Sequence, residues 1–259
     1  MRLMSFLTAV FLASGLFAEG SKSVDDIPTE LRWDGVGRLE FANDSFCTGA
    51  LISPKLVLTA AHCIYDAKTG AKLDATDIQF QAGWRNGHAS ALRNARLAAA
   101  HPDFDFMSQD NATRAQVDLA LIELQHPISD AMILPVYTGQ TPKQGDDVSV
   151  VSYAYDRPEA PSLQKSCDIL AKQNGILVMS CDADFGASGS PVFKFGFDGM
   201  PQIVSLLSAK ATANGAPVSL ATPIQTRLHE LQAIMQTSAD LVGINADTST
   251  STGAGFPSP

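Results

Sequence analysis

The sequence predicts a mainly β protein. Short apolar runs recur along most of the chain, and turn residues separate them, with nineteen glycines and fourteen prolines in 259 residues. This spacing is typical of an all-β sandwich or barrel, whereas strands alternating with long helices would leave a different pattern. The runs expected to form strands are 37–41, 49–52, 56–58, 78–82, 119–124, 148–151, 176–179, 191–193 and 203–207.

The first eighteen residues have the pattern of an export leader. A basic Met1-Arg2 start precedes a mostly apolar stretch at 3–17, and the small Ala18 offers a cleavage site before a polar segment. This pattern predicts a signal peptide over residues 1–18. A transmembrane anchor is the alternative, but the apolar run is short for that role. We therefore expect a secreted or periplasmic protein that has no membrane contact after the leader is removed.

Two stretches have helical character. Residues 60–65 are expected to form one turn after a strand, and 223–235 is expected to form a helix that begins with a proline in its first turn. The second stretch carries apolar residues at a helical spacing, namely Ile224, Leu228, Leu231 and Ile234. The tail 238–259 ends in a segment rich in Ser, Thr, Gly and Pro, and is predicted to be disordered.

The charge of the chain limits its partners. It has 27 acidic and 18 basic residues and a formal net charge of −9. An acidic balance disfavours nucleic acid and anionic membranes as partners. We expect a monomer that acts on a protein or peptide.

The four cysteines predict two disulfides. An even count after an export signal favours pairing, and sequence proximity favours Cys47–Cys63 and Cys167–Cys181 among three possible connectivities. Each bridge would close a loop of about fifteen residues, which stabilises a fold by about 3 kcal/mol in the chain-entropy account. Zinc binding is the alternative, but the sequence has no C-x-x-C pair. No metal or other cofactor is expected.

A histidine follows a strand in the run LTAAHC at 58–63. The ordinary imidazole pKa of about 6.5 makes His62 a suitable base and acid near neutral pH. A hydrogen-bonded core histidine is the alternative, and for this motif alone it is the favoured one. The catalytic interpretation depends on two further motifs.

The second motif is GASGSP at 186–191, in which glycines flank Ser188 at short range. Glycines permit a tight turn that exposes the hydroxyl and lets backbone N–H groups converge, as an oxyanion hole requires. The third is Asp118, which opens an apolar run, VDLALI. A buried carboxylate needs a partner, and the ring N–H of His62 would serve. A plain turn and a surface charge are the respective alternatives.

Together, these motifs and their order resemble the trypsin/chymotrypsin superfamily over residues 36–231. The resemblance implies two six-stranded Greek-key β-barrels, one over 28–134 and one with the helix over 135–237, with an active site in the cleft between them. It also implies a catalytic triad of His62, Asp118 and Ser188.

The roles implied by the resemblance are those of a serine endopeptidase. Ser188 attacks the peptide carbonyl, His62 transfers the proton, and Asp118 orients the imidazole. The backbone N–H groups of Gly186 and Ser188 hold the oxyanion. A homologue that kept the fold, lost turnover and acts by binding is the alternative. An α/β-hydrolase esterase fits poorly, because its triad places histidine last.

The chain departs from trypsin in one respect. Ala187 stands where trypsin-like zymogens have an aspartate that pairs with the freed N-terminus, and no Ile-Val-Gly-Gly start is present. The chain therefore more closely resembles the bacterial glutamyl endopeptidases, in which Ser-Gly-Ser-Pro also occurs. We hypothesise that its oxyanion hole forms without an activating cut, which activity of the chain lacking only its leader would test.

The side-chain preference has two opposed predictions. By ungapped count, Asp182 falls at the acidic floor of the trypsin specificity pocket and would favour Lys or Arg. The pocket wall is expected at Ser208, Ala209 and Lys210, and Lys210 would instead favour acidic side chains. A purely structural role in the disulfide loop is the alternative for Asp182.

Overall fold

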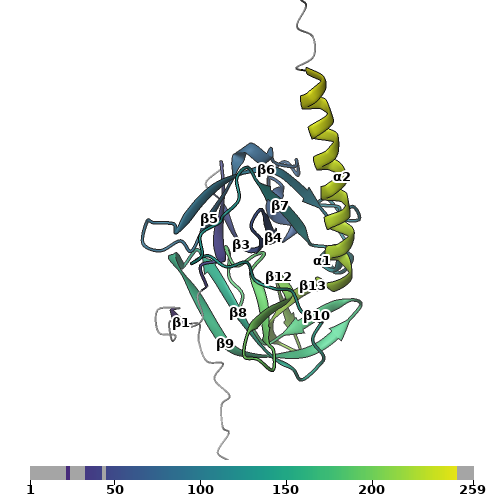
Figure 1. Ribbon diagram of the computed structural model, residues 1–259. Helices are drawn as coiled ribbons and strands as arrows, with labels where there is room; N and C mark the ends of the chain where they lie inside the picture. The colour runs from purple at the N-terminus through teal and green to yellow at the C-terminus, as the bar shows by residue number, and fades with distance from the viewer. Residues whose placement is uncertain (1–21, 24–32, 43–44, 250–259) are drawn as a thin grey trace, which may run out of the picture.

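Two antiparallel β-barrels make up the protein, and their ribbons lie one above the other in Figure 1. The computed structural model describes residues 22–23, 33–42 and 45–249. The predicted signal peptide lies outside the described residues. In chain order the elements are β1 (Lys22–Ser23), β2 (Val36–Phe41), β3 (Phe46–Ser53), β4 (Leu56–Thr59), the 3₁₀ turns η2 (Ala61–Ile64) and η3 (Ala75–Asp77), β5 (Ile78–Ala82), β6 (Ala91–Ala100), α1 (Asn111–Gln116), β7 (Ala120–Leu124), β8 (Asp147–Ala154), β9 (Arg157–Gln173), β10 (Ile176–Met179), β11 (Pro191–Phe195), β12 (Pro201–Ala213), β13 (Ala216–Pro223) and α2 (Gln225–Ser249).

The first barrel closes in the order β2-β3-β4-β7-β6-β5, with β5 returning to pair with β2. The second half of β2 alternates between buried and partly exposed residues, as in a sheet with one solvated face, whereas β3 is buried over its first six residues. Leu39, Val57, Phe80 and Ile122 are fully buried in its interior. The interior of the barrel is closely packed, so the end of β4 is held in a fixed position.

The second barrel is also closed. β8, β9, β10, β13, β12 and β11 pair in sequence around a ring, and β8 pairs with both β9 and β11. The short β1 pairs with residues 162–163 of β9. All strands of the first barrel precede residue 125, so we place the domain boundary in the linking segment 125–146. The predicted all-β architecture of two six-stranded barrels is confirmed.

An apolar interface joins the barrels. Phe46 and Leu121 from the first barrel pack in one buried cluster with Tyr153 of the second. Trp33 lies against Phe193, with 4.7 Å between the ring centroids. Contacts of this kind hold two bodies rigidly, so groups that different barrels present to the cleft keep a fixed separation.

The C-terminal helix α2 follows the last strand of the second barrel but lies beside β6 and β7 of the first (Figure 1). Three of its four predicted apolar contacts are confirmed, since Ile224, Leu228 and Leu231 are buried. Met235 lies four residues after Leu231, on the same face of the helix, and is buried. Ile234, three residues after Leu231, is only half-buried. The helix continues through 238–249, which we predicted to be disordered, and residues 250–259 lie outside the described part.

Both predicted disulfides are present, Cys47–Cys63 in the first barrel and Cys167–Cys181 in the second. In the described part of the chain, no helix has the length and apolar character needed to cross a membrane.

Candidate active site

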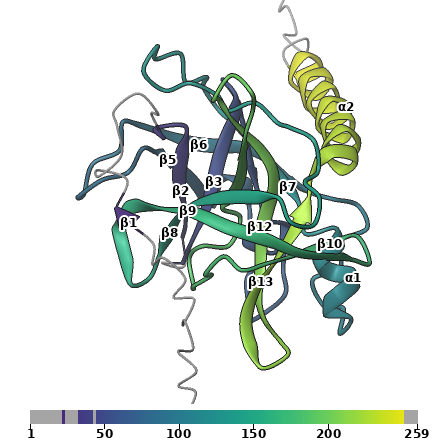
Figure 2. The ribbon, with the colours of Figure 1, turned by 90° about the horizontal axis from the view of Figure 1, so that it is seen from below.

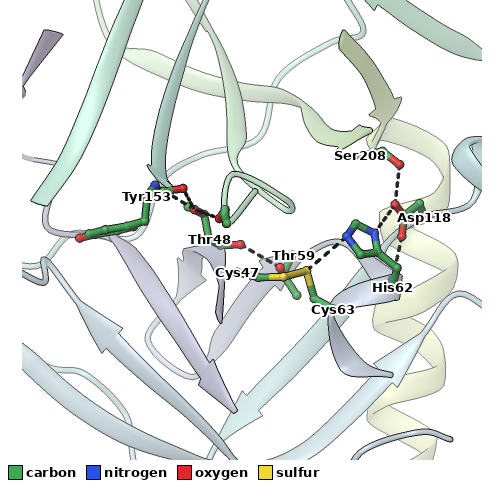
Figure 3. Close-up of a disulfide and its surroundings, with 9 residues drawn as sticks. Cys47, Thr48, Thr59, His62, Cys63, Asp118, Tyr153 and Ser208 are labelled. Carbon is green, nitrogen blue, oxygen red and sulfur yellow. Dashed lines mark hydrogen bonds and ion pairs between the residues drawn. A yellow bond between two sulfur atoms is a disulfide. The ribbon is translucent and has the colours of Figure 1, made fainter. Parts of the chain in front are cut away.

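The end of a buried strand positions His62. β4 is an apolar strand between β3 and β7, and the chain leaves it through Ala60 into the single turn η2 that carries the histidine. The Cys47–Cys63 disulfide ties this turn to β3, and His62 Nε2 lies 3.9 Å from the Cys63 sulfur (Figure 3). The imidazole is thus fixed against the barrel on one side and is partly exposed on the other.

Asp118 is buried, and donors surround its carboxylate. The ring Nδ1 of His62 lies 2.7 Å from Oδ2, and the backbone N–H of His62 donates to Oδ1 at 2.8 Å. The hydroxyl of Ser208 donates to Oδ2 (Figure 3). A buried carboxylate that accepts three such hydrogen bonds fixes both the position and the tautomer of the imidazole.

The two groups shift each other's pKa. Burial would raise the pKa of Asp118, but the His62 charge and the hydrogen bonds from His62 and Ser208 outweigh it and hold that pKa below its ordinary range. Burial would lower the pKa of His62, but the charge and hydrogen bond of Asp118 together raise it above the ordinary value. The positive charge of Arg114 acts in the opposite direction on His62. The pair therefore favours a charged imidazole more than water does.

Ser188 lies in a turn that packs onto two strands of the first barrel, β3 and β4, the second of which leads to His62. The backbone N–H of Thr48 donates to the carbonyl of Ser188 at 2.9 Å. The next residue, Gly189, has a φ of +75° and sits so close to β4 that a Cβ there would lie 2.2 Å from the hydroxyl oxygen of Thr59. Only glycine meets both demands. The close approach brings the Ser188 turn of the second barrel to the end of the strand that delivers His62.

A hydroxyl relay holds the loop before Ser188. The backbone N–H of Tyr153 donates to the hydroxyl of the buried Thr48 at 3.0 Å, and this hydroxyl donates to the carbonyl of Gly186 at 3.1 Å (Figure 3). The N–H of Ala187 donates to the carbonyl of Asp184, which closes a turn. Within the described residues, the N–H groups of Gly186 and Ser188 have no partner. Two free donors in one turn are suited to binding an oxyanion.

Beside Ser188 lies a cavity of about 220 Å³. Its lining includes the predicted Ser208, Ala209 and Lys210, together with four residues that sequence reasoning missed, Ala183, Asp184, Phe185 and Leu207. Ala183, Asp184 and Phe185 directly precede the GASGSP motif and Leu207 precedes Ser208, but no local sequence pattern marks these four residues as pocket residues. The surface of the cavity is mostly apolar.

The two charges proposed to set specificity do not both reach this cavity. Lys210 Nζ lies 2.7 Å from the Asp184 carboxylate and 5.5 Å from the centre of the Phe185 ring. Asp182 is exposed and lines a neighbouring cavity of about 620 Å³ that does not include Ser188. Ser208, predicted only as a wall residue, also contacts Asp118.

One group of potential metal ligands occurs among the described residues, formed by Cys47, His62 and Cys63. The two sulfurs are joined in a disulfide, so they are not available as thiolate ligands.

Comparison with known proteins identifies the same region. The profile of the Trypsin-like peptidase domain matches residues 47–197, which include all three motifs. Serine protease 23 of Mus musculus is 32% identical over 164 residues, which cover 57% of this chain and 42% of that protein. Glutamyl endopeptidase of Bacillus licheniformis is 29% identical over 149 residues, which cover 57% of this chain and 45% of that protein. The chain thus spans less than half the length of these relatives.

The fold is also known. A solved structure of a Glu endopeptidase in complex with MPD superposes with a TM-score of 0.69 and 18% sequence identity, and the match covers 85% of this chain and 97% of that one. At this identity the match establishes the two-barrel fold. Because the family profile covers more than half of the sequence and the fold agrees with it, the chain belongs to the trypsin-like serine peptidase family and has relatives among the glutamyl endopeptidases.

Proposed function

We propose that this member of the family is an active serine endopeptidase, with His62, Asp118 and Ser188 as its catalytic triad. The observation that carries the proposal is the buried Asp118 carboxylate at 2.7 Å from His62 Nδ1. With Nδ1 as the donor, a neutral imidazole leaves Nε2 free to accept a proton. Membership of a peptidase family implies protein substrates.

The reaction follows from these positions. Ser188 Oγ bonds to the carbonyl carbon of the scissile peptide while its proton passes to His62 Nε2. The carbonyl oxygen becomes an oxyanion, which accepts hydrogen bonds from the N–H groups of Gly186 and Ser188. When the C–N bond breaks, Nε2 returns the proton to the leaving amine and an acyl ester on Ser188 remains. Water then repeats both steps, releases the acid and restores the hydroxyl.

Digestion of an unfolded protein tests the proposal. The chain lacking residues 1–18 is expected to cleave it at discrete sites, which mass spectrometry of the fragments would map. Enzyme first treated with an organofluorophosphonate is the matched control, since the reagent consumes an activated serine hydroxyl. Equal fragmentation by treated and untreated enzyme, or none by either, would rule out the proposed triad.

The cavity beside Ser188 supports a preference for uncharged side chains before the scissile bond. Asp184 neutralises Lys210 at its rim, and Ala183 and Leu207 supply buried apolar surface. Asp182 lines the other cavity, so neither of the charged preferences predicted from sequence is supported. The mapped cleavage sites decide among the three.

We propose that the Thr48 relay replaces the N-terminal ion pair of trypsin-like enzymes. Ala187 has no charge to offer, whereas the Thr48 hydroxyl bonds to Gly186 without any new chain end. Thr48→Val keeps the shape but leaves a buried N–H and carbonyl without a partner. We expect kcat to fall about 10- to 100-fold with little change in KM, because the oxyanion donors lose their support.

Ser205→Ala is the control for this variant. The hydroxyl of Ser205 is also buried and donates to a carbonyl, that of Thr222 at 2.8 Å, but it has no bond to the loop before Ser188. A kcat for Thr48→Val no lower than that of the control would show that the relay does not support the oxyanion hole.

The raised pKa of His62 sets the pH dependence. Protonated His62 cannot accept the Ser188 proton, so kcat/KM falls as pH drops through the pKa of the free enzyme. Because Asp118 raises this pKa, the midpoint of the acid limb is expected above the ordinary histidine value of 6.5. Initial rates from pH 5 to 9 at constant ionic strength would measure it, and a midpoint below 6.5 would contradict the assignment.

The leader pattern and the two disulfides support export. Structural disulfides persist in oxidising compartments, which include the periplasm and the extracellular space. We propose that the mature protein acts there on protein substrates.

A further inference from the structure

Arg114 lines the same cavity as His62 and forms no ion pair among the described residues. It donates to the carbonyls of Phe106 at 3.1 Å and Ser108 at 3.4 Å, and to the side-chain oxygen of Asn111 at 2.9 Å. All three acceptors are uncharged, and among the described residues no carboxylate pairs with Arg114. The hydrogen bonds therefore orient the cation and leave its charge in place.

This charge faces a cavity that also contains the proposed catalytic groups. The cavity has a volume of about 530 Å³, and its lining includes Arg114, His62, Asp118, Ser208 and Ala209. Arg114 lowers the pKa of His62, so its field reaches the imidazole. Lys210 also lines the cavity, but its ammonium pairs with Asp184. The carboxylate that lines the cavity, Asp118, is bonded to His62, so Arg114 remains a cation without a carboxylate partner there.

The edge of β12 shows how a substrate would reach the cavity. β11 pairs with β12 only as far as Leu206, and past Leu207 the only described strand beside β12 is β13, on its other edge. An extended peptide can add to such an open edge, beside residues 208–210. Figure 2 shows α1, which carries Arg114, next to the β10 and β13 side of the same barrel.

Strand geometry then assigns side chains to cavities. Successive side chains of an extended peptide point to opposite faces. The two cavities share residues 208–210, and only the second contains His62 and Arg114. If the residue before the scissile bond enters the cavity beside Ser188, we expect the residue upstream of it to face the second cavity. A long acidic side chain there would meet the guanidinium, which recognises carboxylates through its fork of N–H donors.

We propose that Arg114 forms a subsite for a carboxylate side chain on the second residue before the scissile bond. This inference rests on the proposed endopeptidase activity and adds a selectivity to it. It predicts that substrates with Glu at that position are preferred even though the chain as a whole is acidic, with a net charge of −9.

A set of fluorogenic peptides tests the subsite. All share one mapped cleavage sequence and differ only in the second residue before the cut, which is Glu, Gln, Ala or Lys. We expect kcat/KM for Glu to exceed that for Gln about tenfold at low salt, with Lys the poorest, and the ratio to shrink at high salt. In Arg114→Gln the Glu preference disappears, in Arg114→Lys it is retained in part, and in Arg114→Glu the order inverts toward Lys.

Arg93→Gln is the matched control. Arg93 also donates to backbone carbonyls, those of Pro127 and Leu92, and pairs with no carboxylate in the described part of the chain, but it does not line the cavity. It should keep the wild-type Glu-to-Gln ratio. The pH profile gives a second readout, because loss of the Arg114 charge should move the acid limb to higher pH.

The outcomes separate the two proposals. Cleavage of all peptides by the wild type without a Glu preference, or a preference that survives in Arg114→Gln, would overturn the subsite and leave the endopeptidase assignment standing. No cleavage of any peptide, together with no reaction with a fluorophosphonate, would overturn both. The wild-type ratio and its salt dependence decide the question even if one variant fails to fold.

Discussion

Replacing Ser188 with alanine is expected to lower kcat/KM by about 10⁴- to 10⁶-fold. Without the hydroxyl no acyl ester can form, and His62 has no proton to take from it. Residual hydrolysis would come from water attacking a carbonyl held by the oxyanion donors of Gly186 and residue 188, whose backbone N–H groups remain. Peptide hydrolysis over long incubations, with the product measured by mass spectrometry, gives the ratio.

A matched test separates chemistry from folding. The side chain of Ser188 makes no hydrogen bond to any described residue, so its removal should leave the melting temperature unchanged. A competitive peptide inhibitor should bind the variant and the wild type with similar Kd, since the other residues that line the cavity beside residue 188 and the cavity that contains His62 are unchanged. A variant that retains more than one hundredth of the activity would refute a nucleophilic role.

Asp118→Asn is expected to lower kcat/KM by about 10⁴-fold at neutral pH, the size of the effect in triads of this type. An asparagine amide has one acceptor oxygen, which can accept from the His62 backbone N–H at the position of Oδ1 and so places the NH₂ at the position of Oδ2, next to His62 Nδ1. Its NH₂ then donates to His62 Nδ1, and the imidazole keeps its proton on Nε2, where it cannot act as a base. The loss therefore arises from the wrong tautomer.

The acid limb should move as well. Asp118 raises the pKa of His62 through its charge and its hydrogen bond, so the neutral amide should lower that pKa and move the limb to lower pH. Asp103→Asn is the control, because Asp103 lies beside another histidine, His101, at 3.9 Å and outside the site. A fall in activity of less than tenfold, or an acid limb that stays in place, would contradict the role given to Asp118.

The sequence predicted what is local in the chain. His62 and Ser188 each lie in a short motif whose neighbouring residues indicate the end of a strand for His62 and a glycine turn for Ser188. The cysteines that are nearest in sequence pair with each other. Gly189 illustrates why this works, because its close approach to Thr59 is a demand of the structure that only one residue type can meet. Fold class followed from the same local spacing of apolar runs.

Contacts between distant segments were not predictable in this way. The Thr48 hydroxyl meets Gly186 across 138 positions, and Ser208 meets Asp118 across 90. Threonine and serine occur throughout the sequence, and neither residue's local neighbourhood indicates a partner. Arg114 was missed for the same reason, since only the packing of α1 against the second barrel places its charge beside His62.

Four strands escaped prediction, the two-residue β1 and the barrel strands β6, β9 and β13. β6 is rich in alanine with Arg93 and Arg96 among its outer positions, so it shows no clear apolar alternation. The seventeen-residue β9 contains two prolines and several charged residues, and many of its side chains are exposed. β13 mixes small and polar residues and is stabilised by pairing with β12 and β10.

The central claim is that His62 activates Ser188, and intact-mass measurement after exposure to an organofluorophosphonate tests it most directly. The account predicts one adduct per wild-type chain, located on Ser188 by peptide mapping, and none in His62→Ala at the same reagent concentration and time. An adduct on another residue, or equal labelling of Ser188 in His62→Ala, would contradict it.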